Sequence, residues 1–384
     1  MKILILVSDI GQSAPGVVFE RLIMGLSSSH QLTIISANNN SKLNLSKVNH
    51  WYVIKKIKGS TLIHKPMMSY FGFNILDILW ARKVFSYVKS LESNHFDVVF
   101  SFISNHKFAP LIAGYRISMA LNCRFALYSV DAIPAFGWPE ESRYYLKVEK
   151  MMKKYLNKVN ALYSSNFQML NYQLSFINNP KEVVSDVIYN PIIEKFNKYS
   201  IIKGVDYCFV YTGKIYGLRN PKYVLEAFEK LLLKYKNSKL IFVEAIIPKE
   251  FLSNLKIETI EKIEFHPFVT NLEPFYTKAT ALIDIDAELD NDLFMSSKIT
   301  NYININRIII SESSFNSPSN QLFKNIHSVF QCSHNSDEIC DSMIKAIELK
   351  LSISYEDRNN ILTLFNLDNV INRLNKSLNL LKLT

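Results

Sequence analysis

One loop carries a glycine and two basic residues at a position where they could hold a phosphate. The apolar run Tyr207–Tyr211 is followed by Gly213, Lys214 and Arg219, and Pro221 stands where a helical pattern begins. Cations at the carboxyl end of a strand suit a diphosphate, because they neutralise the charge that builds up on a departing nucleotide. A solvated basic loop without a ligand is the alternative interpretation.

A second segment places small hydroxyl residues at the start of a helix. Ser296 and Ser297 follow the apolar run Ala281–Asp284 and an acidic loop, and they open a helical pattern that contains Asn301. Hydroxyl residues there supply helix caps and leave backbone N–H groups for an anion, although capping alone explains the same residues. Both loops follow strands of one predicted domain, where a doubly wound sheet binds its ligands.

The loop after the first predicted strand contains two glycines. The run Ile3–Ser8 predicts a buried strand, and Gly11 and Gly16 lie in the turn before a helix that we expect to begin at Val17 or Val18. Glycines in such a turn let the backbone approach an anion or a sugar hydroxyl closely. The spacing differs from the dinucleotide fingerprint, so an ordinary strand-to-helix turn fits equally well.

Strand-like apolar runs alternate with helical patterns along the chain, which is typical of parallel sheets built from βαβ units. The predicted strands are Ile3–Ser8, Gln31–Ser36, Trp51–Ile54, Asp97–Phe102, Phe125–Val130, Ala161–Ser164, Tyr207–Tyr211, Lys239–Val243, Lys262–Phe265, Ala281–Asp284 and Arg307–Ser311. The helical patterns between them include Val18–Ser27, Asn74–Ser90, Ala109–Met119, Glu140–Asn157, Pro221–Tyr235 and Ser336–Lys350. The fold class that this alternation predicts is α/β.

Length and pattern together predict two domains. A chain of 384 residues is longer than one core ordinarily holds. Asn190 and Pro191 break the pattern and a polar stretch follows, so we expect a linker there. The predicted domains are residues 1–190 and 205–358, each a Rossmann-like doubly wound sheet. The amphipathic segment 359–384 predicts a C-terminal helix that packs back across the lobes.

Composition restricts the class of protein. With 48% hydrophobic and 20% charged residues, the chain has enough apolar material for folded cores. The net charge of +10 fits an acidic partner such as anionic lipid or a phosphorylated substrate, and it fits a merely solvated surface equally well. No nucleic-acid-binding module is recognisable. The four cysteines lack metal-ligand spacing, and no signal peptide or membrane-spanning run is evident, so we expect a cytoplasmic protein with reduced thiols.

The second half resembles the nucleotide-binding half of retaining GT-B glycosyltransferases, in particular glycosyltransferase family 4. The resemblance rests on Thr212–Phe228, a strand end, a Gly-basic loop and a helix that contains Leu-Glu-Ala-Phe. Lys214 stands where the family usually has Arg, and Arg219 where it usually has Lys, as the pair that holds the donor pyrophosphate. The resemblance implies two lobes facing across a cleft, metal-independent transfer with retention, and no cofactor.

Further on, Ser297–Ile303 resembles a family variant that reads Ser-Lys-Leu, two residues, then Tyr-Leu. Most members have two glutamates in this region, the first near the sugar and the second on the ribose hydroxyls. In this chain the second position is Asn301, which can still hydrogen-bond a ribose hydroxyl. The first position falls on Leu293, so the adjacent Asp292 is the substitute candidate.

The first half resembles the acceptor-binding half of the same family. Asp131 matches the aspartate of a His-Asp pair, with Val130 in place of the histidine, and His106 lies after another predicted strand. A lone histidine is more often a packing or surface residue. The candidate site residues are therefore Lys214, Arg219, Asp131 and Asp292 for catalysis, Gly213, Lys214, Arg219, Ser296, Ser297 and Asn301 for the donor, and Gly11, Gly16 and His106 on the acceptor side.

Two stretches of the first half bear on the acceptor. Residues His64–Phe73 are apolar and aromatic next to a cation, and Arg143–Tyr155 predicts a basic amphipathic helix. Such surfaces can rest on anionic headgroups and bring a lipid-linked acceptor to the site. The alternative for the second stretch is an outer helix that buries Tyr, Leu and Met while its lysines face water.

The resemblance implies a retaining, metal-independent glycosyltransferase of the hexosyltransferase type. We expect it to use a nucleotide-sugar donor, foremost a UDP-sugar, and a saccharide or lipid-linked acceptor, without nucleic acid. The resemblance implies a role in bacterial surface polysaccharide biosynthesis at the inner face of the cell membrane. Two alternatives stay open: a nucleotide-sugar epimerase of GT-B shape, and a non-catalytic GT-B-like binding protein.

Overall fold

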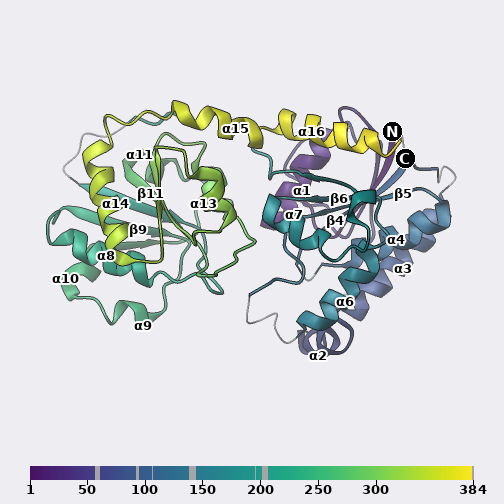
Figure 1. The fold of residues 1–384 in the computed structure, drawn as a ribbon, viewed down its shortest axis with the longest axis horizontal. Helices are drawn as coiled ribbons and strands as arrows, with labels where there is room; N and C mark the ends of the chain where they lie inside the picture. The colour runs from purple at the N-terminus through teal and green to yellow at the C-terminus, as the bar shows by residue number, and fades with distance from the viewer. Residues whose placement is uncertain are drawn as a thin grey trace. The chain divides into compact units, whose positions relative to one another are not determined.

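A computed structural model describes residues 1–56, 61–91, 95–105, 107–137, 144–194, 196–200 and 206–382. The chain forms two compact units (Figure 1). Unit 1 comprises Met1–Ile193 and Leu364–Thr384, and unit 2 comprises Glu194–Thr363. Unit 1 is therefore built from both ends of the chain, and unit 2 from the segment between them.

Unit 1 contains a parallel sheet of seven strands within the described residues. The strands are β1 (Lys2–Val7), β2 (Gln31–Ser36), β3 (His50–Val53), β4 (Val98–Ile103), β5 (Arg124–Ser129), β6 (Ala161–Ser164) and β7 (Val184–Val187). Their order is β3-β2-β1-β4-β5-β6-β7, so the direction in which strands are added reverses between β1 and β4. The central strands read as continuous apolar runs because both faces of the sheet are covered.

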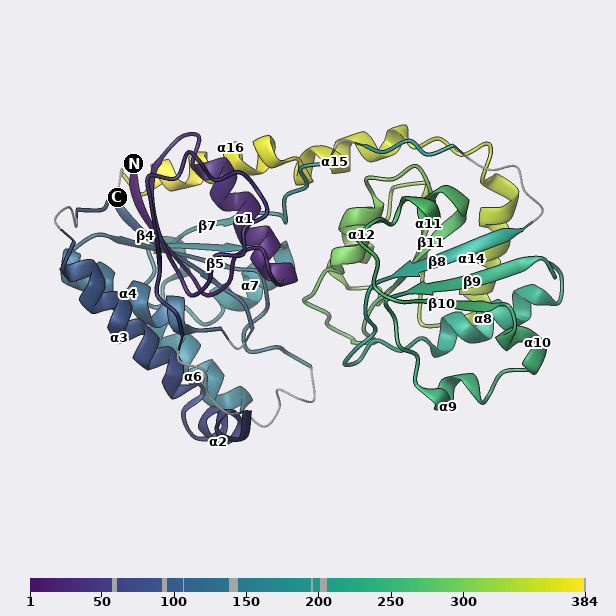
Figure 2. The ribbon, with the colours of Figure 1, turned by 180° about the vertical axis from the view of Figure 1, so that it is seen from behind.

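Helices cover both faces of this sheet (Figures 1 and 2). The helices are α1 (Ala14–Leu26), α2 (Thr61–Phe71), α3 (Ile75–Lys89), α4 (Ala109–Leu121), α6 (Tyr145–Leu156), α7 (Phe167–Leu174) and α16 (Leu367–Leu380). Leu4 and Leu6 of β1 pack in one core with residues of α3, α4 and α6, whereas Ile3 and Ile5 pack in a second core with α1 and α16. A short 3₁₀ turn, Pro180–Glu182, precedes β7.

The C-terminal helix α16 is an integral part of unit 1. Its residues Val370, Ile371 and Leu374 are buried in the same core as α1. The two helices approach so closely that a Cβ on Gly25 of α1 would collide with the Ile371 side chain. Arg373 of α16 also forms an ion pair with Asp186 of β7. The end of the chain therefore closes one face of the N-terminal sheet.

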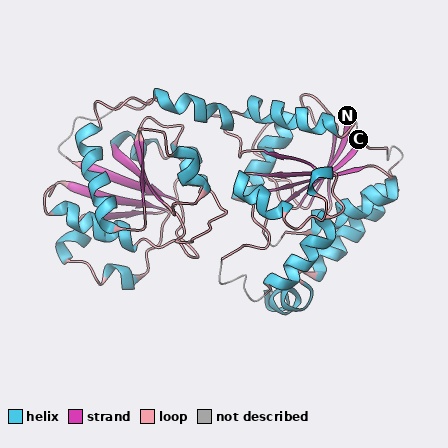
Figure 3. Ribbon diagram, viewed as in Figure 1, coloured by secondary structure: helices cyan, strands magenta, loops and turns pink. Residues whose placement is uncertain are grey.

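Unit 2 contains a second parallel sheet, of six strands within the described residues (Figure 3). The strands are β8 (Tyr207–Thr212), β9 (Ser238–Val243), β10 (Ile263–His266), β11 (Ala279–Ile285), β12 (Ile308–Glu312) and β13 (Val329–Cys332). Their order is β10-β9-β8-β11-β12-β13, so the reversal lies between β8 and β11, where Ala281 pairs with Phe209. Each unit has its own switch point of the doubly wound type.

The helices of unit 2 are longer on one face of its sheet. They are α8 (Lys222–Leu232), α9 (Lys249–Leu252), α10 (Ile257–Ile260), α11 (Glu273–Lys278), α12 (Ser297–Tyr302), α13 (Pro318–Phe323) and α14 (Ser336–Leu349), followed by a 3₁₀ turn at Glu356–Arg358 and by α15 (Asn359–Phe365). Phe228 of α8 and Met343 of α14 are fully buried in one core with Phe209 of β8. The buried residues of each of these two helices recur about once per turn, so they form an apolar stripe that faces the sheet.

Two buried arginines fasten the segments around this core. Arg358 has no exposed surface and donates to the carbonyl oxygens of Ile305 at 2.5 Å and Arg307 at 2.6 Å. Arg307 donates to the carbonyls of Tyr199 at 3.2 Å and Ser200 at 2.9 Å. The segment that enters unit 2 is thus held by hydrogen bonds from the interior of that unit.

Three expectations about element boundaries need correction. Helix α1 begins at Ala14, earlier than expected, because the Ser13 hydroxyl caps it by accepting from Gly16 N at 3.2 Å and Pro15 suits a first turn. Gly16 therefore lies in the helix. The edge strands β7 and β13 were not predicted, because both are short and polar side chains interrupt their apolar runs, Ser185 and Asp186 in β7 and Gln331 in β13.

The C-terminal segment is also interrupted. We expected a single helix through Asn359–Leu381, but α15 and α16 are separate. Asn366 between them is extended, with φ −60° and ψ 130°, and its side chain accepts from Asn369 N at 3.2 Å. An N-cap asparagine thus starts a new helix within the amphipathic pattern. No helix of the described residues is long and apolar enough to cross a membrane.

Candidate functional site

The glycine after β8 is required by its backbone and by a neighbouring side chain. Gly213 has φ +98°, in the region that favours glycine, and its N–H donates to Val243 O at 2.8 Å. A Cβ at this position would lie 3.0 Å from Cε of Lys298. The loop that the sequence singled out therefore runs directly past the side chain of Lys298, which the sequence did not single out.

Arg219 is buried at the carboxyl end of the sheet. Its side chain is 8% exposed, its guanidinium lies 4.9 Å from the centre of the Tyr216 ring, and Nη2 is 3.5 Å from Asp286 Oδ1. Burial by itself would lower the pKa of this group, but Asp286 and Tyr216 raise it above its ordinary value. The Nε atom is buried and finds no hydrogen-bond acceptor among the residues that the structure describes. A permanent cation with an unused donor therefore lies at this edge of the sheet.

Lys214 differs from Arg219 in exposure. Its side chain is 71% exposed, and Nζ is 3.6 Å from Glu244 Oε1. Its carbonyl accepts a hydrogen bond from the Tyr211 hydroxyl at 3.0 Å, which fixes the backbone of the loop. The ammonium itself is free to move in solvent, because a single long ion pair at the surface holds it weakly.

Lys298, from the first turn of α12, is a third cation at this edge. Its Nζ lies 5.2 Å from the centre of the Tyr211 ring. Burial, and then the positive charge of Arg219, lower the pKa of Lys298 to about 8. Sequence reasoning quoted this lysine within a motif without giving it a role. Its proximity to Gly213 depends on how α12 is placed against β8, and no local pattern encodes that placement.

A tyrosine fixes α12 against the end of β8. Tyr302 has no exposed surface, and its hydroxyl accepts from Thr212 N at 2.8 Å and lies 2.9 Å from Thr212 Oγ1. Ser296, the N-cap of α12, is also fully buried; its hydroxyl donates to Asp284 Oδ1 at 2.6 Å and accepts from Lys298 N at 3.2 Å. The Ser296 hydroxyl is thus engaged by protein groups, whereas Ser297 and Asn301 of α12 are exposed.

Three buried aspartates surround these cations. Asp284, Asp286 and Asp292 are at most 1% exposed, and in each the Oδ2 atom is buried without a hydrogen-bond partner. Burial, and then the proximity of Asp286, raise the pKa of Asp284 to about 6 and that of Asp292 to about 8. Burial therefore favours the protonated form of Asp292, in which the carboxyl group can donate a hydrogen bond.

A buried pair adds to this group from the next strand. Glu312 at the end of β12 is 1% exposed, and its Oε1 is 2.8 Å from His334 Nδ1. Burial raises the pKa of Glu312 to about 7, although the contact with His334 opposes this shift. Within the described residues no cluster of three or more His, Cys, Asp or Glu has the geometry to hold a metal ion.

The candidate residues of unit 1 lie at its own switch point. Asp9, after β1, accepts hydrogen bonds from Ser13 and from Asn38 Nδ2 at 2.8 Å, and Lys107 Nζ is 3.1 Å away. Burial would raise the pKa of Asp9, but these partners lower it below its ordinary value. Gly11, with φ +73°, allows the loop to fold back, since a Cβ would collide with Asn40 O.

Asp131, after β5, accepts a hydrogen bond from Asn105 N at 2.8 Å through Oδ2. Gly16 lies against Asp9, with 3.1 Å between its Cβ position and the carboxyl carbon. His106 lies outside the described residues. Within unit 1 the structure thus gathers the loops after β1, β4 and β5, and within unit 2 it gathers Gly213, Arg219, Asp292 and Ser296. Sequence reasoning named Asp292 but missed Lys298, Asp284, Asp286 and Glu312; of these, only the alternating aspartates Asp284 and Asp286 at the end of β11 gave a signal.

No protein-family model and no curated protein matches the chain. Solved structures with the same fold do match over its whole length. A glycosyltransferase from Rickettsia africae is 13% identical, with 100% of both chains covered and a TM-score of 0.69. HepE from Anabaena in complex with UDP and glucose is 12% identical, with 99% of both chains covered and a TM-score of 0.67.

Two further structures extend the comparison. The lipopolysaccharide outer core galactosyltransferase WaaB is 12% identical, with 98% of this chain and 99% of that chain covered and a TM-score of 0.65. A protein from Listeria monocytogenes described as a putative UDP-N-acetylglucosamine 2-epimerase is 10% identical, with 98% and 95% covered and a TM-score of 0.52. At these identities the likeness establishes the fold alone. The chain has the α/β fold of GT-B glycosyltransferases, with two Rossmann-like sheets, as the sequence predicts.

Proposed function

We propose that this protein is a glycosyltransferase that moves a sugar from a UDP-sugar to a saccharide or lipid-linked saccharide acceptor. Unit 2 holds the donor and unit 1 the acceptor. The observation that carries the proposal is Arg219, a buried guanidinium with an unused Nε donor at the switch point of the unit 2 sheet. A doubly wound sheet binds its ligands at that point. The UDP and UDP-glucose complexes of HepE support this choice of donor.

The proposed mechanism stabilises the leaving group by side-chain charge. When the bond between sugar and diphosphate breaks, negative charge builds up on the diphosphate oxygens. Arg219 is always charged and lies in a water-poor site, where its interaction with an oxyanion is strong. Lys214, exposed on the same loop, can reach an oxygen on the solvent side. In this proposal the two cations, and not a metal ion, stabilise the leaving diphosphate. The sugar is transferred with retention at its anomeric carbon.

Other candidate residues take supporting roles in the proposal. Asp292, in its protonated form, would donate a hydrogen bond to the sugar. Ser297 and the N–H groups near Ser296 would contact the diphosphate, and Asn301 a ribose hydroxyl. On the acceptor side we assign Gly11, Gly16, Asp131 and His106, the last of which lies outside the described residues. The proposed setting, as the resemblance to family 4 implies, is bacterial surface polysaccharide synthesis in the cytoplasm.

The primary experiment measures UDP release from UDP-sugars with and without saccharide acceptors. Release that depends on the acceptor supports transfer. Conversion of the UDP-sugar without an acceptor would instead identify an epimerase. Binding without turnover would identify a non-catalytic binding protein. A thermal-shift panel of UDP, GDP and ADP identifies the base, because a ligand that favours the native state raises its apparent stability. If no nucleoside diphosphate shifts the transition, the proposal is wrong.

A matched pair of variants tests the basic loop. Lys214→Ala should weaken UDP binding, because it removes a mobile cation next to the diphosphate. Lys236→Ala is the control. Lys236 is also exposed in unit 2, but it precedes β9 and so lies at the amino-terminal ends of the strands, opposite the basic loop. Both variants should keep the melting temperature of the unliganded protein, because neither lysine is buried. Equal UDP affinity in the two variants would remove Lys214 from the site.

We also propose that unit 1 rests on an anionic membrane surface. Tyr70 and Phe71 at the end of α2 are 76% and 56% exposed, and Leu146 at the start of α6 is 77% exposed. The two helix ends adjoin, because a Cβ on Gly72 would lie 2.6 Å from the Lys147 carbonyl oxygen. These three exposed side chains are called the α2–α6 tip below, and exposed apolar groups gathered at one place can mark an interaction site.

Positive charge beside the α2–α6 tip favours a lipid surface over a neutral partner. Lys147, Lys150 and Lys154 of α6 are exposed, whereas Val148, Met151 and Met152 are buried in unit 1. The helix therefore keeps its apolar face in the core, as expected of an outer helix, and offers lysines and Leu146 to the outside. Apolar side chains inserted between headgroups, with lysines on the phosphates, are how a peripheral protein holds an anionic leaflet.

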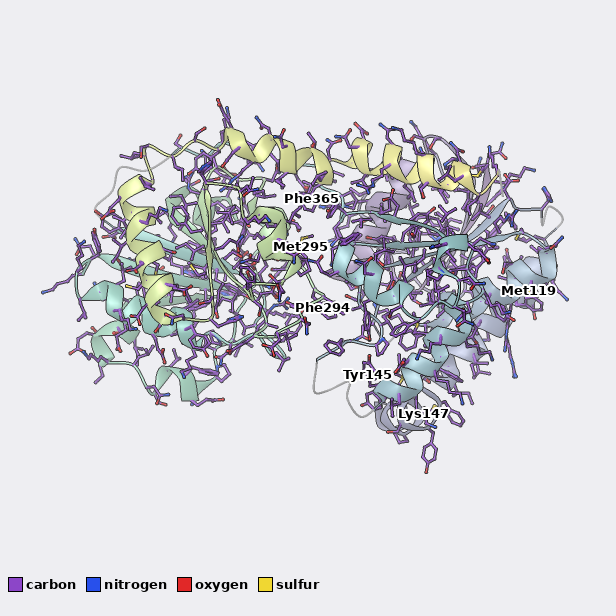
Figure 4. All side chains as sticks on the ribbon, in the orientation of Figure 1. Met119, Tyr145, Lys147, Phe294, Met295 and Phe365 are labelled. Carbon is purple, nitrogen blue, oxygen red and sulfur yellow. The ribbon has the colours of Figure 1, made fainter. Side chains whose placement is uncertain are left out.

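Vesicle sedimentation tests this contact. The protein should sediment with vesicles that contain anionic lipid and remain in solution with zwitterionic vesicles. Leu146→Glu should abolish the sedimentation. Met119→Glu is the control, because Met119 of α4 is 65% exposed and lies well away from Tyr145 and Lys147 (Figure 4). Equal sedimentation of both variants would exclude the α2–α6 tip as the membrane contact.

A further inference from the structure

Lys298 is a half-buried cation, and no carboxylate oxygen of the described residues lies within ion-pair distance of its ammonium. Its ammonium forms no hydrogen bond and no ion pair with the residues that the structure describes; its contact is with the face of the Tyr211 ring, 5.2 Å from the centre. Its neighbour across the loop is Gly213, which leaves room for the lysine because it has no side chain. A charge that is partly removed from water is stabilised by a nearby anion, so this arrangement favours an anionic ligand.

The surrounding carboxylates do not fill that place. Asp284 is engaged by Ser296, and Asp286 accepts from Ala287 N at 3.0 Å and lies opposite Arg219. Arg219 repels Lys298, since its positive charge lowers the pKa of the Lys298 ammonium. Two cations brought together at the end of one strand are stabilised by a ligand with charge on two adjacent groups, which describes a diphosphate.

We propose that Lys298 binds the diphosphate of the donor together with Arg219, so that donor binding is coupled to the uptake of a proton by Lys298. This inference rests on the proposed function. It adds Lys298 to the residues that bind the diphosphate, and it makes donor binding depend on pH. Without the donor, part of the Lys298 population gives up its proton to avoid a partly buried charge. With the donor bound, the diphosphate holds Lys298 in its charged form.

The sign of the pH dependence follows from the groups that face Lys298. Arg219 favours the neutral amine, whereas Asp284, Asp286 and Glu244 favour the ammonium. The net result is a pKa of about 8 in the free protein. A diphosphate raises this pKa, so UDP affinity is greatest below pH 8 and falls as the pH rises. If the pKa in the complex is above 10, affinity falls roughly tenfold between pH 7 and pH 9.

One other group titrates in the same range. Asp292, with a pKa of about 8, becomes negative as the pH rises and would also repel a diphosphate. Asp292→Asn removes this contribution and leaves that of Lys298. Lys298→Arg does the opposite, because arginine keeps its charge throughout this range. Ionisation of the nucleotide itself is common to all variants and cancels when they are compared.

The experiment is isothermal titration of UDP into the wild-type protein and the variants at pH 7 and pH 9. The wild type and Asp292→Asn should lose affinity at pH 9, and Lys298→Arg should lose clearly less than the wild type. Lys298→Met should bind UDP roughly 10- to 100-fold more weakly at pH 7, the cost of one charged hydrogen bond. If Lys298→Met and the wild type bind UDP equally, Lys298 is not a ligand of the diphosphate.

Unliganded stability separates binding from a structural role. If Lys298 only balanced the charge of Asp284 and Asp286, Lys298→Met would lower the melting temperature without UDP. The proposal expects the melting temperature to stay equal or rise, since an unpaired, partly buried charge is removed. Normal UDP binding by the wild type with no effect of Lys298→Met overturns this inference alone. No UDP binding by the wild type at pH 7 overturns the proposed function as well.

Discussion

Tyr302→Phe should destabilise unit 2 because it removes a buried hydroxyl group that forms hydrogen bonds in the core of this unit. The Tyr302 hydroxyl accepts from the backbone N–H of Thr212 at 2.8 Å and lies 2.9 Å from Thr212 Oγ1. Phenylalanine fills nearly the same volume, so packing is kept. The Thr212 N–H is left buried without an acceptor, which costs about 1–3 kcal/mol.

The assay is thermal or urea unfolding of the full chain. For a unit of this size, 1 kcal/mol corresponds to about 2–4 °C in melting temperature, so the expected loss is about 2–12 °C. Tyr207→Phe is the matched control, because Tyr207 begins the same strand, is partly exposed, and makes ring contacts with Tyr235 rather than a hydroxyl bond. That variant should change the melting temperature by less than about 2 °C.

The same variant also reports on the site. Tyr302 holds α12 against the end of β8, and α12 carries Lys298 past Gly213. A loosened helix should therefore weaken UDP binding, although Tyr302 does not touch the ligand in the proposed arrangement. Equal stability of Tyr302→Phe and Tyr207→Phe would refute the reasoning, because it would mean that the Thr212 N–H finds water or another acceptor at no cost.

Three further predictions concern stability. Gly11→Ala should destabilise unit 1 by about 2 kcal/mol or more in urea unfolding, because φ is +73° and Asn40 O occupies the place of the new Cβ; an unchanged midpoint would mean that the loop can refold around it. Arg358→Met should cost about 3 kcal/mol or more, since several buried carbonyl oxygens lose their donor, and Arg373→Met, with a half-exposed side chain, should cost less. The stability of unit 2 should fall as the pH rises from about 5 to 8, because burial raises the pKa of Glu312 to about 7 and that of Asp292 to about 8. Over this range the folded state binds protons that the unfolded state has lost. Asp292→Asn should flatten the fall between pH 6 and 8, which unfolding curves measured at each pH would show.

The α/β alternation was predictable because it is written locally in the sequence. Continuous apolar runs such as Ile3–Val7 mark strands that are covered on both faces, and the expected fold class is confirmed. The edge strand Val184–Val187 was missed, because Ser185 and Asp186 separate its two valines and no apolar run marks it. The break at Asn366 was missed because the amphipathic pattern continues across it, while one side-chain cap decides where the new helix begins.

The candidate site was predictable only in part. Gly213 and Arg219 follow an apolar run, so their place at a strand end could be inferred from the sequence. Lys298 could not be assigned, because its meeting with Gly213 depends on the pairing of β8 with β11 and on the Tyr302 hydroxyl. The protonation of Asp292 was also beyond the sequence, since it arises from burial beside Asp286.

The closure of unit 1 by α16 has a consequence for synthesis on the ribosome. The buried face of α1, with Phe19, Leu22 and Ile23, meets Val370 and Ile371 of α16, and these lie beyond the whole of unit 2 in the chain. Part of the apolar surface of α1 and the first sheet therefore stays uncovered until α16 has been made. Unit 2 consists of one continuous segment that precedes α16. It can therefore finish folding before unit 1, although translation of unit 1 begins first.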